Sequence, residues 1–314
     1  MKKLTKRDIS DIIKNYDVGK LISYKRIFTA ANLIYKINTT KGKFVLKLYL
    51  SSSEKSIINQ IDLMSFLNNN GVVVPKNLHT LKREPLLLWK GNKITIQEFI
   101  VGKKRQYVNK TLAKDMGKKY GLLNIVLNKY KTKSKNIENK NIEQFNLLNW
   151  KTKGLSDIDI KKESKKIVKE IKKLKKGKLT RALIHGDLGE GNFLVVDNKI
   201  TAILDFDNIN KNYLVCELAV PISQNFITLT KVKKDLIKIF LREYQRYIKL
   251  NNEEKKALYL FVKYQELFDI YWCYNQIEKF PKEKDELMKW TRTALKQYRL
   301  IDKISLEEWM KNLK

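Results

Sequence analysis

Residues 181–208 carry the pattern from which the fold is inferred: RALIHGDLGEGNFLVVDNKITAILDFDN. The polar loop HGDLGEGN at 185–192 follows one apolar run, and two further apolar runs flank the short polar segment DNK at 197–199. Turn-forming residues between β-branched and apolar runs predict a β-hairpin. We expect such a hairpin to bring Asn192, at the start of one strand, near Asp205, at the end of its partner.

Three side chains of this stretch offer oxygen atoms that suit a metal ion: Asp187, Asn192 and Asp205. Mg²⁺ is usually held by a few oxygen ligands of the protein together with the phosphates of a substrate. Phosphoryl transfer requires this metal and a residue that orients the attacking hydroxyl or accepts its proton. The pattern therefore predicts a site for phosphoryl transfer.

The same residues carry a resemblance to a known family. Segment 185–192 matches the kinase catalytic-loop pattern H-x-D-L-x-x-x-N, and Asp205-Phe206-Asp207 lies where kinases carry D-F-G. The chain resembles the aminoglycoside phosphotransferase and choline kinase superfamily, whose usual form is H-G-D-x-x-x-x-N followed by D-F or D-W. A weaker likeness, in segment 241–254, is to homoserine-kinase-like and spore-coat-kinase-like members.

This resemblance implies roles for the residues of the motif. Asp187 corresponds to the catalytic base or hydroxyl-orienting group, and His185 to a residue that supports the loop. Asn192 and Asp205 correspond to the ligands of Mg²⁺. ATP and Mg²⁺ are the expected cofactors, and the expected partner is a small-molecule hydroxyl acceptor.

The first part of the chain predicts an antiparallel sheet. Alternating runs at 34–38 and 43–49 flank the turn residues 39–42, and a second hairpin is predicted at 86–99. In the superfamily such strands belong to the lobe that binds ATP. Lys47, in V-L-K-L, stands where the superfamily has the lysine that contacts the α- and β-phosphates.

The segment QEFIVG at 97–102 resembles the hinge between the two lobes of the superfamily. The resemblance assigns contacts with the adenine ring to the backbone of this segment. The expected nucleotide-binding residues are Gln97, Glu98, Phe99 and Ile100. From the residues alone, an ordinary edge strand is the alternative.

Two departures from the superfamily pattern concern the nucleotide. Segment 26–32, where a glycine-rich phosphate loop is expected, contains no glycine, although it has small residues. In the helix predicted at 54–69, the position of the glutamate that pairs with the strand lysine falls on Gln60. An amide there is able to hydrogen-bond Lys47 but carries no charge, and Glu54 and Asp62 remain alternative partners for it.

Helical periodicity dominates the rest of the chain. A short helix at 5–16 begins with Thr5 and Asp8 in a capping-box pattern, and a solvated loop is predicted at 129–147. Further helices are predicted at 110–128, 155–175, 231–248, 252–279 and 283–300.

The expected fold is therefore α+β and two-lobed, like that of protein kinases. Residues 1–98 are expected to form the ATP-binding lobe, an antiparallel sheet with a helix. Residues 99–314 are expected to form the catalytic and acceptor-binding lobe, which is mainly α-helical.

Composition limits the class of protein and its partners. The chain has 314 residues with 43% hydrophobic residues, enough for two ordinary cores. The net charge is +32, but only nine of its 65 basic residues are arginine, and the lysines are spread along the chain. Specific phosphate readers favour arginine forks, so we favour compositional bias over a dedicated polyanion site and do not expect nucleic acid as a partner.

The cysteines and the apolar runs suggest a cytoplasmic protein without a membrane span. Cys216 and Cys273 stand in apolar or aromatic surroundings without a C-x-x-C pattern, as free thiols do in a reducing compartment. No apolar run approaches the ~18 residues of a membrane span. The oligomeric state stays open.

The predicted activity is ATP- and Mg²⁺-dependent phosphorylation of a small-molecule hydroxyl. The expected acceptor is an amino alcohol, hydroxy amino acid, sugar or choline-like compound, and the sequence does not identify it further. Two alternatives remain: a catalytically inactive kinase-like scaffold, suggested by Gln60 and the glycine-free loop, and a kinase of a larger anionic acceptor, suggested by the charge. An aminoglycoside acceptor is disfavoured, because cationic drugs require an acidic pocket and so basic a chain gives no sign of one.

Overall fold

The computed structural model describes residues 3–27, 32–104, 107–131 and 160–313. Residues 28–31, in the expected phosphate loop, lie outside this description, as does most of the loop predicted at 129–147. The chain divides into two compact units. The first comprises Met1–Lys103, Tyr130–Asn136 and Thr201–Asp207; the second comprises Lys104–Lys129, Ile137–Ile200 and Asn208–Lys314.

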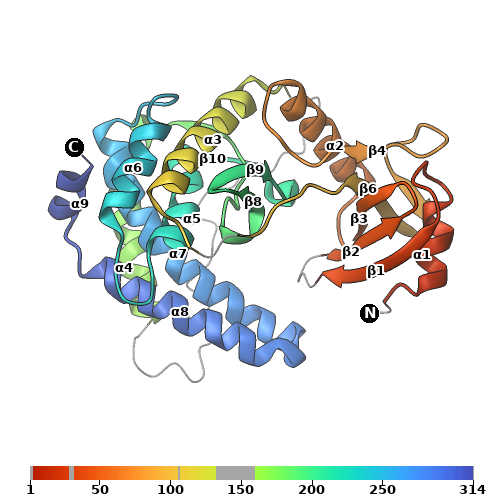
Figure 1. The fold of residues 1–314 in the computed structure, drawn as a ribbon. Helices are drawn as coiled ribbons and strands as arrows, with labels where there is room; N and C mark the ends of the chain where they lie inside the picture. The colour runs from red at the N-terminus through yellow and green to blue at the C-terminus, as the bar shows by residue number, and fades with distance from the viewer. Residues whose placement is uncertain (1–2, 28–31, 105–106, 132–159, 314) are drawn as a thin grey trace. The chain divides into compact units, whose positions relative to one another are not determined.

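The first unit is built on an antiparallel sheet with the strand order β1-β2-β3-β6-β4, and β5 also pairs with β6 (Figure 1). Both predicted hairpins are present. In the β5–β6 turn Lys90 and Gly91 have positive φ angles of 48° and 74°, as a tight two-residue hairpin turn requires. The strands are β1 (Leu21–Ile27), β2 (Asn32–Thr39), β3 (Gly42–Tyr49), β4 (Asn77–Leu78), β5 (Leu87–Trp89) and β6 (Asn92–Glu98).

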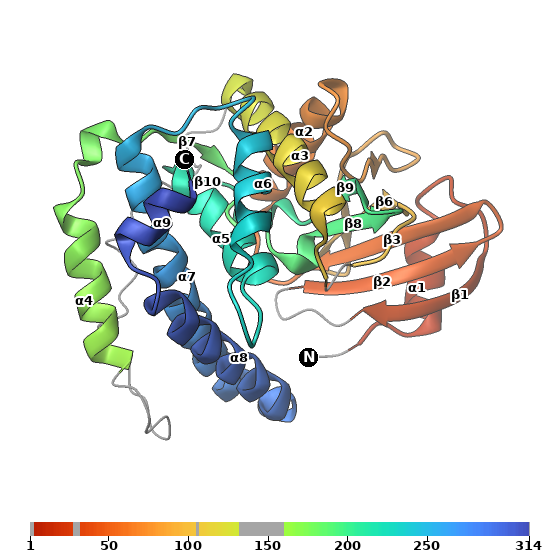
Figure 2. The same ribbon diagram turned by 60° about the vertical axis from the view of Figure 1, so that its left-hand side comes forward.

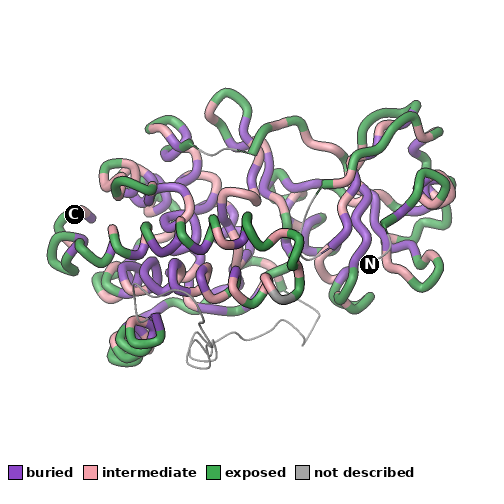
Figure 3. Tube along the Cα trace, turned by 90° about the horizontal axis from the view of Figure 1, so that it is seen from below, coloured by how far each residue is buried: buried purple, intermediate pink, exposed green. Residues whose placement is uncertain are grey.

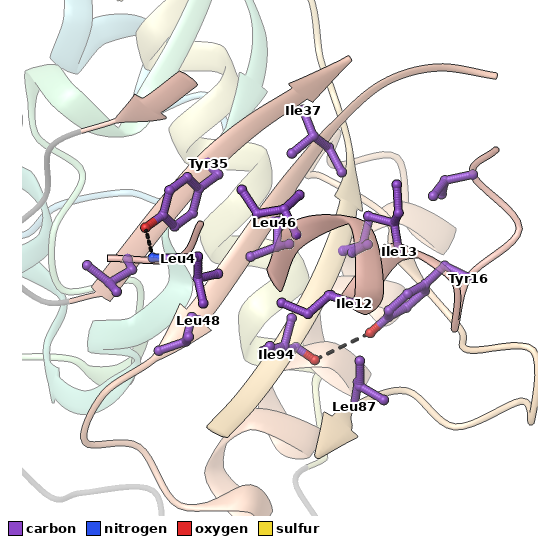
Figure 4. Packing of buried hydrophobic residues seen from close by; sticks show 14 residues of the cluster. Leu4, Ile12, Ile13, Tyr16, Tyr35, Ile37, Leu46, Leu48, Leu87 and Ile94 are labelled. Atoms are coloured by element: carbon purple, nitrogen blue, oxygen red, sulfur yellow. Dashed lines mark hydrogen bonds between the residues drawn. The ribbon is translucent and has the colours of Figure 1, made fainter. Parts of the chain in front are cut away.

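Helix α1 (Lys6–Ile13) packs its buried isoleucines on one face of this sheet (Figure 4). Its start has the predicted capping box: the Thr5 hydroxyl accepts a hydrogen bond from the Asp8 N–H, and the Asp8 carboxylate accepts one from the Thr5 N–H. Leu46 and Leu48 of β3 belong to the same buried cluster.

The opposite face of β3 carries Lys47 and Tyr49, because successive side chains of a strand alternate between the two faces. Tyr49 is buried against Ile57 and Ile61 of α2 (Glu54–Asn69), the helix predicted at 54–69. The strand lysine therefore lies on the side of the sheet that α2 covers.

The second unit is mainly helical, and α7 and α8 lie side by side along much of their length (Figure 2). Gly117 allows α3 to approach α6 closely, since a Cβ atom there would lie 2.3 Å from the Phe240 carbonyl oxygen. The α-helices of this unit are α3 (Lys110–Lys129), α4 (Ile160–Lys173), α5 (Leu214–Phe226), α6 (Lys234–Tyr244), α7 (Asn252–Lys279), α8 (Lys284–Asp302) and α9 (Leu306–Asn312).

The helix predicted at 231–248 is shorter than expected. It begins at Lys234 because Lys231 is held in a preceding turn, where the Thr228 N–H donates to the Lys231 carbonyl oxygen, and it ends at Tyr244. Single 3₁₀ turns occur at η3 (Lys176–Lys178), η4 (Glu190–Asn192), η5 (Phe206–Asn208) and η6 (Pro281–Glu283).

Two small two-stranded sheets accompany the central motif. The predicted hairpin is present as β8 (Phe193–Val196) and β9 (Lys199–Ile203), with Asp197 and Asn198 in the left-handed conformation at its turn. A second pair, not predicted from the sequence, joins β7 (Arg181–Ile184) to β10 (Asn210–Tyr213).

Buried residues run along the inner strands of the first unit and the central helices of the second unit (Figure 3). None of the helices in the described part of the chain combines the length and apolar character needed to cross a membrane.

Candidate active site

Strand β7 leads directly into the loop that carries Asp187, and a buried glutamate fixes this loop. The carboxylate of Glu217, in the first turn of α5, accepts hydrogen bonds from the backbone N–H of His185 at 2.8 Å and of Gly186 at 2.9 Å. Glu217 and His185 are both fully buried. The Asn124 amide donates to the same carboxylate at 3.2 Å. The first residues of the loop are therefore anchored to helix α5.

Gly186 allows the loop to turn tightly. Its φ angle is +80°, and a Cβ atom at this position would lie 2.6 Å from both the Asn208 carbonyl oxygen and the Asn210 amide nitrogen. A side chain here would be strained and would collide with the chain that follows the hairpin. Steric crowding therefore explains why the H-G-D sequence has a glycine at this position.

Asp187 and Asn192 lie side by side in this loop. The Asn192 amide donates to the Asp187 backbone carbonyl oxygen at 2.8 Å and to its carboxylate at 2.9 Å. The Asp187 N–H donates to Nδ1 of His185 at 3.3 Å, which gives His185 the supporting position that the resemblance implied. The Asp187 side chain is half-buried, so its carboxylate is both oriented and partly open to solvent.

Asp269 of α7 is linked to the loop that carries Asp187 through the side chain of Gln224. Gln224 of α5 accepts a hydrogen bond from the Glu190 N–H at 3.1 Å and also hydrogen-bonds the carboxylate of Asp269. The Gln265 amide donates to Asp269 at 2.7 Å. Burial raises the pKa of Asp269 to about 7.

Deeper between α5 and α7 lies a second acid, Glu266. It is fully buried and accepts a hydrogen bond from the Ser223 hydroxyl at 3.0 Å. Its other carboxylate oxygen has no hydrogen-bond partner among the described residues. Burial, reinforced by Asp269, raises the pKa of Glu266 well above its usual range, so this group favours its neutral form.

In the first unit, a polar cluster surrounds Lys47. Its ammonium lies 2.6 and 2.7 Å from the two carboxylate oxygens of Asp207 and 3.5 Å from Asp205. The Lys47 side chain is only 7% exposed. Burial disfavours its charge, but Asp207 and Asp205 outweigh burial and raise the pKa of Lys47, which therefore stays charged.

Gln60 also belongs to this cluster, in which it contacts Asp207 and Tyr49. Its amide nitrogen donates to Asp207 at 2.5 Å, and its amide oxygen accepts from the Tyr49 hydroxyl at 3.4 Å. Among the described residues, the acidic partners of Lys47 are Asp205 and Asp207, and the two alternatives Glu54 and Asp62 are exposed side chains of α2. Instead of the expected hydrogen bond to each other, Gln60 and Lys47 both contact the carboxylate of Asp207.

Asp205 combines an exposed carboxylate with an unusual backbone conformation. Its side chain is 42% exposed and its φ angle is +61°, a left-handed conformation that is uncommon outside glycine and concentrates at functional sites. Desolvation by the surrounding protein and the nearby Asp207 raise the pKa of Asp205. The carboxylate of Asp205 and the amide oxygen of Asn192 are donor types that fit Mg²⁺.

The predicted hinge residues span the end of β6: Gln97 and Glu98 are its last two residues, and Phe99 and Ile100 follow it. Gln97 pairs with Val45 of β3 and Asn77 of β4, and the Glu98 N–H donates to the Lys76 carbonyl oxygen at 2.9 Å. The Phe99 ring lies 4.3 Å below the ammonium of Lys36, and Ile100 is half-buried.

Three residues of the site are not singled out by the sequence patterns. Asp207 enters only as part of D-F-D, Glu217 lies in an apolar segment without an assigned role, and Asp269 belongs to no motif. The available signals are an acid in place of the kinase glycine, an acid in the C-E-L-A segment, and an acid beside Phe268 in an aromatic helix. None of these signals indicates which backbone or side chain the acid contacts.

Known proteins similar to this chain are kinases. A homoserine kinase of Bradyrhizobium diazoefficiens is 23% identical over 82% of this chain and 80% of its own. A homoserine kinase of Nitrobacter winogradskyi is 34% identical over 30% of each chain. In structure, a microcompartment-associated aminopropanol kinase matches with a TM-score of 0.78 at 14% identity, covering 97% of this chain and 98% of that one.

An amicoumacin kinase solved with AMP-PNP, Ca²⁺ and amicoumacin matches with a TM-score of 0.75 at 15% identity, covering 96% of this chain and 95% of that one. These structural likenesses confirm the predicted kinase-like fold class. The family model of the phosphotransferase enzyme family matches residues 28–247. This match confirms the predicted class of enzyme, and the chain belongs to the phosphotransferase enzyme family.

Proposed function

We propose that this phosphotransferase transfers the γ-phosphoryl group of ATP to the hydroxyl of a small alcohol that also carries an amine. The observation that carries the transfer step is the loop geometry. Asp187 is oriented by Asn192, and the loop itself is anchored on Glu217. A scaffold protein has no need of a half-exposed carboxylate held in this way.

The first unit is proposed to bind the nucleotide. Lys47 is charged, nearly buried and held by carboxylates, which suits contact with the α- and β-phosphates. Gln97, Glu98, Phe99 and Ile100 are proposed to contact the adenine through their backbone, and Gln60 to support the phosphate site. These roles correspond to residues 1–98 as an ATP-binding lobe and 99–314 as a catalytic lobe.

Catalysis would depend on positioning and charge. Asp187 orients the acceptor hydroxyl and takes its proton as the oxygen attacks the γ-phosphorus, and the bond from this phosphorus to the bridging oxygen breaks so that ADP leaves. Lys47 offsets negative charge on the phosphates. Asn192 and Asp205 are the residues that would hold Mg²⁺, which when bound neutralises charge on the β- and γ-phosphates.

The amine of the acceptor is proposed to bind at Asp269. Gln224 connects this carboxylate to the loop of Asp187. Trp272 lies on the same face of α7 as Asp269, because it is three positions further along the helix. A carboxylate and an aromatic ring on one face of a helix together recognise an ammonium group through charge and cation–π attraction. Homoserine and aminopropanol, for which two of the similar kinases are named, both carry an amine and a hydroxyl.

The test is a panel of paired acceptors with purified protein, ATP and Mg²⁺. Each amino alcohol, such as homoserine or an aminopropanol, is paired with the compound of similar size that lacks the amine, such as a propanediol. Release of ADP and the ³¹P spectrum of the product are measured. We expect phosphate on the hydroxyl of the amine-bearing member of a pair.

Two outcomes contradict parts of the proposal. Equal turnover of both members of every pair removes the amine requirement but keeps the phosphotransferase. Nucleotide binding without turnover of any hydroxyl compound supports the inactive scaffold instead.

A further inference from the structure

Asp207 has more hydrogen-bond donors around it than any other carboxylate near Lys47. Each of its oxygens faces the Lys47 ammonium, at 2.6 and 2.7 Å. The Gln60 amide from α2 donates to Oδ1 at 2.5 Å, and the Asn32 amide from β2 donates to Oδ2 at 2.7 Å. Donors from β2, β3 and α2 thus converge on one side chain.

The orientation of the Gln60 amide follows from its second contact. Its oxygen accepts from the Tyr49 hydroxyl at 3.4 Å, so its nitrogen is turned toward Asp207. An amide in this orientation stabilises a carboxylate, whereas it offers Lys47 no negative charge. The helix therefore contributes a hydrogen bond to the cluster, and the charge has to come from elsewhere.

We infer that Asp207 is the positioning residue for Lys47, and that it supplies the charge which the superfamily pattern places on the helix at Gln60. Gln60 and Asn32 hold Asp207, and Asp207 in turn holds the lysine. The inference rests on the proposed function, because it concerns the aiming of Lys47 at nucleotide phosphates.

The same geometry separates Asp207 from its neighbour Asp205. Two carboxylate oxygens accept about four hydrogen bonds, and Asp207 already has contacts to Lys47, Gln60 and Asn32 on both of them. Its side chain is 19% exposed, against 42% for Asp205. Asp205 has Lys47 alone as its ion-pair partner among the described residues, at 3.5 Å. Asp205 also has a backbone hydrogen bond with Asp207. Asp207 thus positions the lysine, while the more exposed Asp205 has fewer contacts and is the acid proposed to hold a metal.

The experiment moves the negative charge from position 207 to position 60. Wild type, Asp207→Asn, Gln60→Glu and the double variant are compared by kcat and KM for ATP and by the affinity for ADP with Mg²⁺. We expect Asp207→Asn to lower kcat/KM for ATP about 10- to 150-fold, the factor that corresponds to one charged hydrogen bond. In the double variant, the carboxylate introduced by Gln60→Glu would restore the charge on the helix and recover most of this loss.

The matched control is Asp17→Asn, which removes an exposed aspartate paired with Lys41 on the surface of the same unit. It should leave the kinetic constants unchanged. Thermal unfolding midpoints are measured for every variant, so that a loss of folded structure is distinguished from a loss of Lys47 positioning. If Asp207→Asn does not fold, Gln60→Ala, which loosens Asp207 without removing its charge, should lower the affinity for ADP by a smaller factor.

Three results would overturn the inference. Asp207→Asn could retain wild-type constants, the folded double variant could be no better than Asp207→Asn, or the main effect could be a higher Mg²⁺ requirement, which would make Asp207 a metal ligand. ADP affinity requires no acceptor, so the effect of moving the charge is measurable even if no phosphoryl transfer is found. A failure of the proposed function is therefore distinguishable from a failure of this inference.

Discussion

The amide of Asn192 donates to both the backbone and the side chain of Asp187, at 2.8 and 2.9 Å. The residue proposed to hold a metal therefore also orients the residue proposed to face the acceptor. The two differ in charge, because Asp187 contributes a negative charge and Asn192 only a dipole. Substitutions at the two positions should consequently affect different steps.

Asp187→Asn should abolish most turnover while leaving nucleotide binding intact. The substitution keeps the size of the side chain but removes its ability to accept a proton, and general-base assistance is typically worth ~10²–10⁴-fold. Single-turnover rates and ADP affinity test this, with Asp197→Asn at the exposed hairpin turn as the control. Turnover within a few-fold of wild type would remove Asp187 from the mechanism.

Asp205→Ala should weaken Mg²⁺-dependent nucleotide binding more than Asn192→Ala does. A carboxylate contributes a full charge to a bound cation, whereas an amide contributes a dipole. Titrations of both variants with Mg·ATP and with metal-free ATP separate the metal from the nucleotide. If both variants lose metal-free ATP binding equally, the assignment of metal ligands is incorrect.

The sequence predicted the elements of this fold well wherever a local pattern determines the local structure. The capping box at Thr5, the helix α2 and the turn of the β5–β6 hairpin depend on neighbouring residues, and each is present. The pairing of β7 with β10 was not predicted, because its two strands are short and are separated along the chain by the whole stretch from Ile184 to Asn210.

For the candidate site, the sequence identified the residues of the loop but not the contacts between distant ones. Gln60 was expected to hydrogen-bond Lys47, yet it donates to Asp207, 147 positions away. A motif gives the spacing of residues along the chain, whereas the partner of a buried charge depends on which elements pack together. The contacts of Asp207 and Glu217 were therefore recognisable only once the tertiary structure was known.

Glu217→Ala should lower the free energy of unfolding and the rate of turnover together. The substitution leaves the N–H groups of the buried His185 and the half-buried Gly186 without an acceptor, at a cost of about 1–3 kcal/mol for each unsatisfied group. Denaturant unfolding should show a loss of about 2–6 kcal/mol. Glu286→Ala, at an exposed position of α8, is the control. An unfolding free energy equal to wild type would mean that α5 does not anchor the loop.

Asp269→Asn should stabilise the protein increasingly as the pH rises from 5 to 8. Burial raises the pKa of Asp269 to about 7 in the folded chain, while an unfolded aspartate has a pKa of ~3.9. Between these values the folded state binds more protons than the unfolded state, so wild-type stability falls with pH, by at most about 1.4 kcal/mol per pH unit from this group. Asparagine does not ionise, so this part of the pH dependence disappears in the variant.

Denaturant unfolding at four pH values measures the gap, which is the difference in the free energy of unfolding between wild type and Asp269→Asn. The groups that face Asp269 are Gln265, Glu266 and Cys273 on α7 and Gln224 on α5. Because Asp269 also raises the pKa of Glu266, the variant Glu266→Gln is compared in parallel to separate the two acids. A gap between wild type and Asp269→Asn that stays constant with pH would show that Asp269 ionises as freely as a surface aspartate. A bound amino alcohol should flatten the wild-type curve, since its ammonium favours the ionised carboxylate.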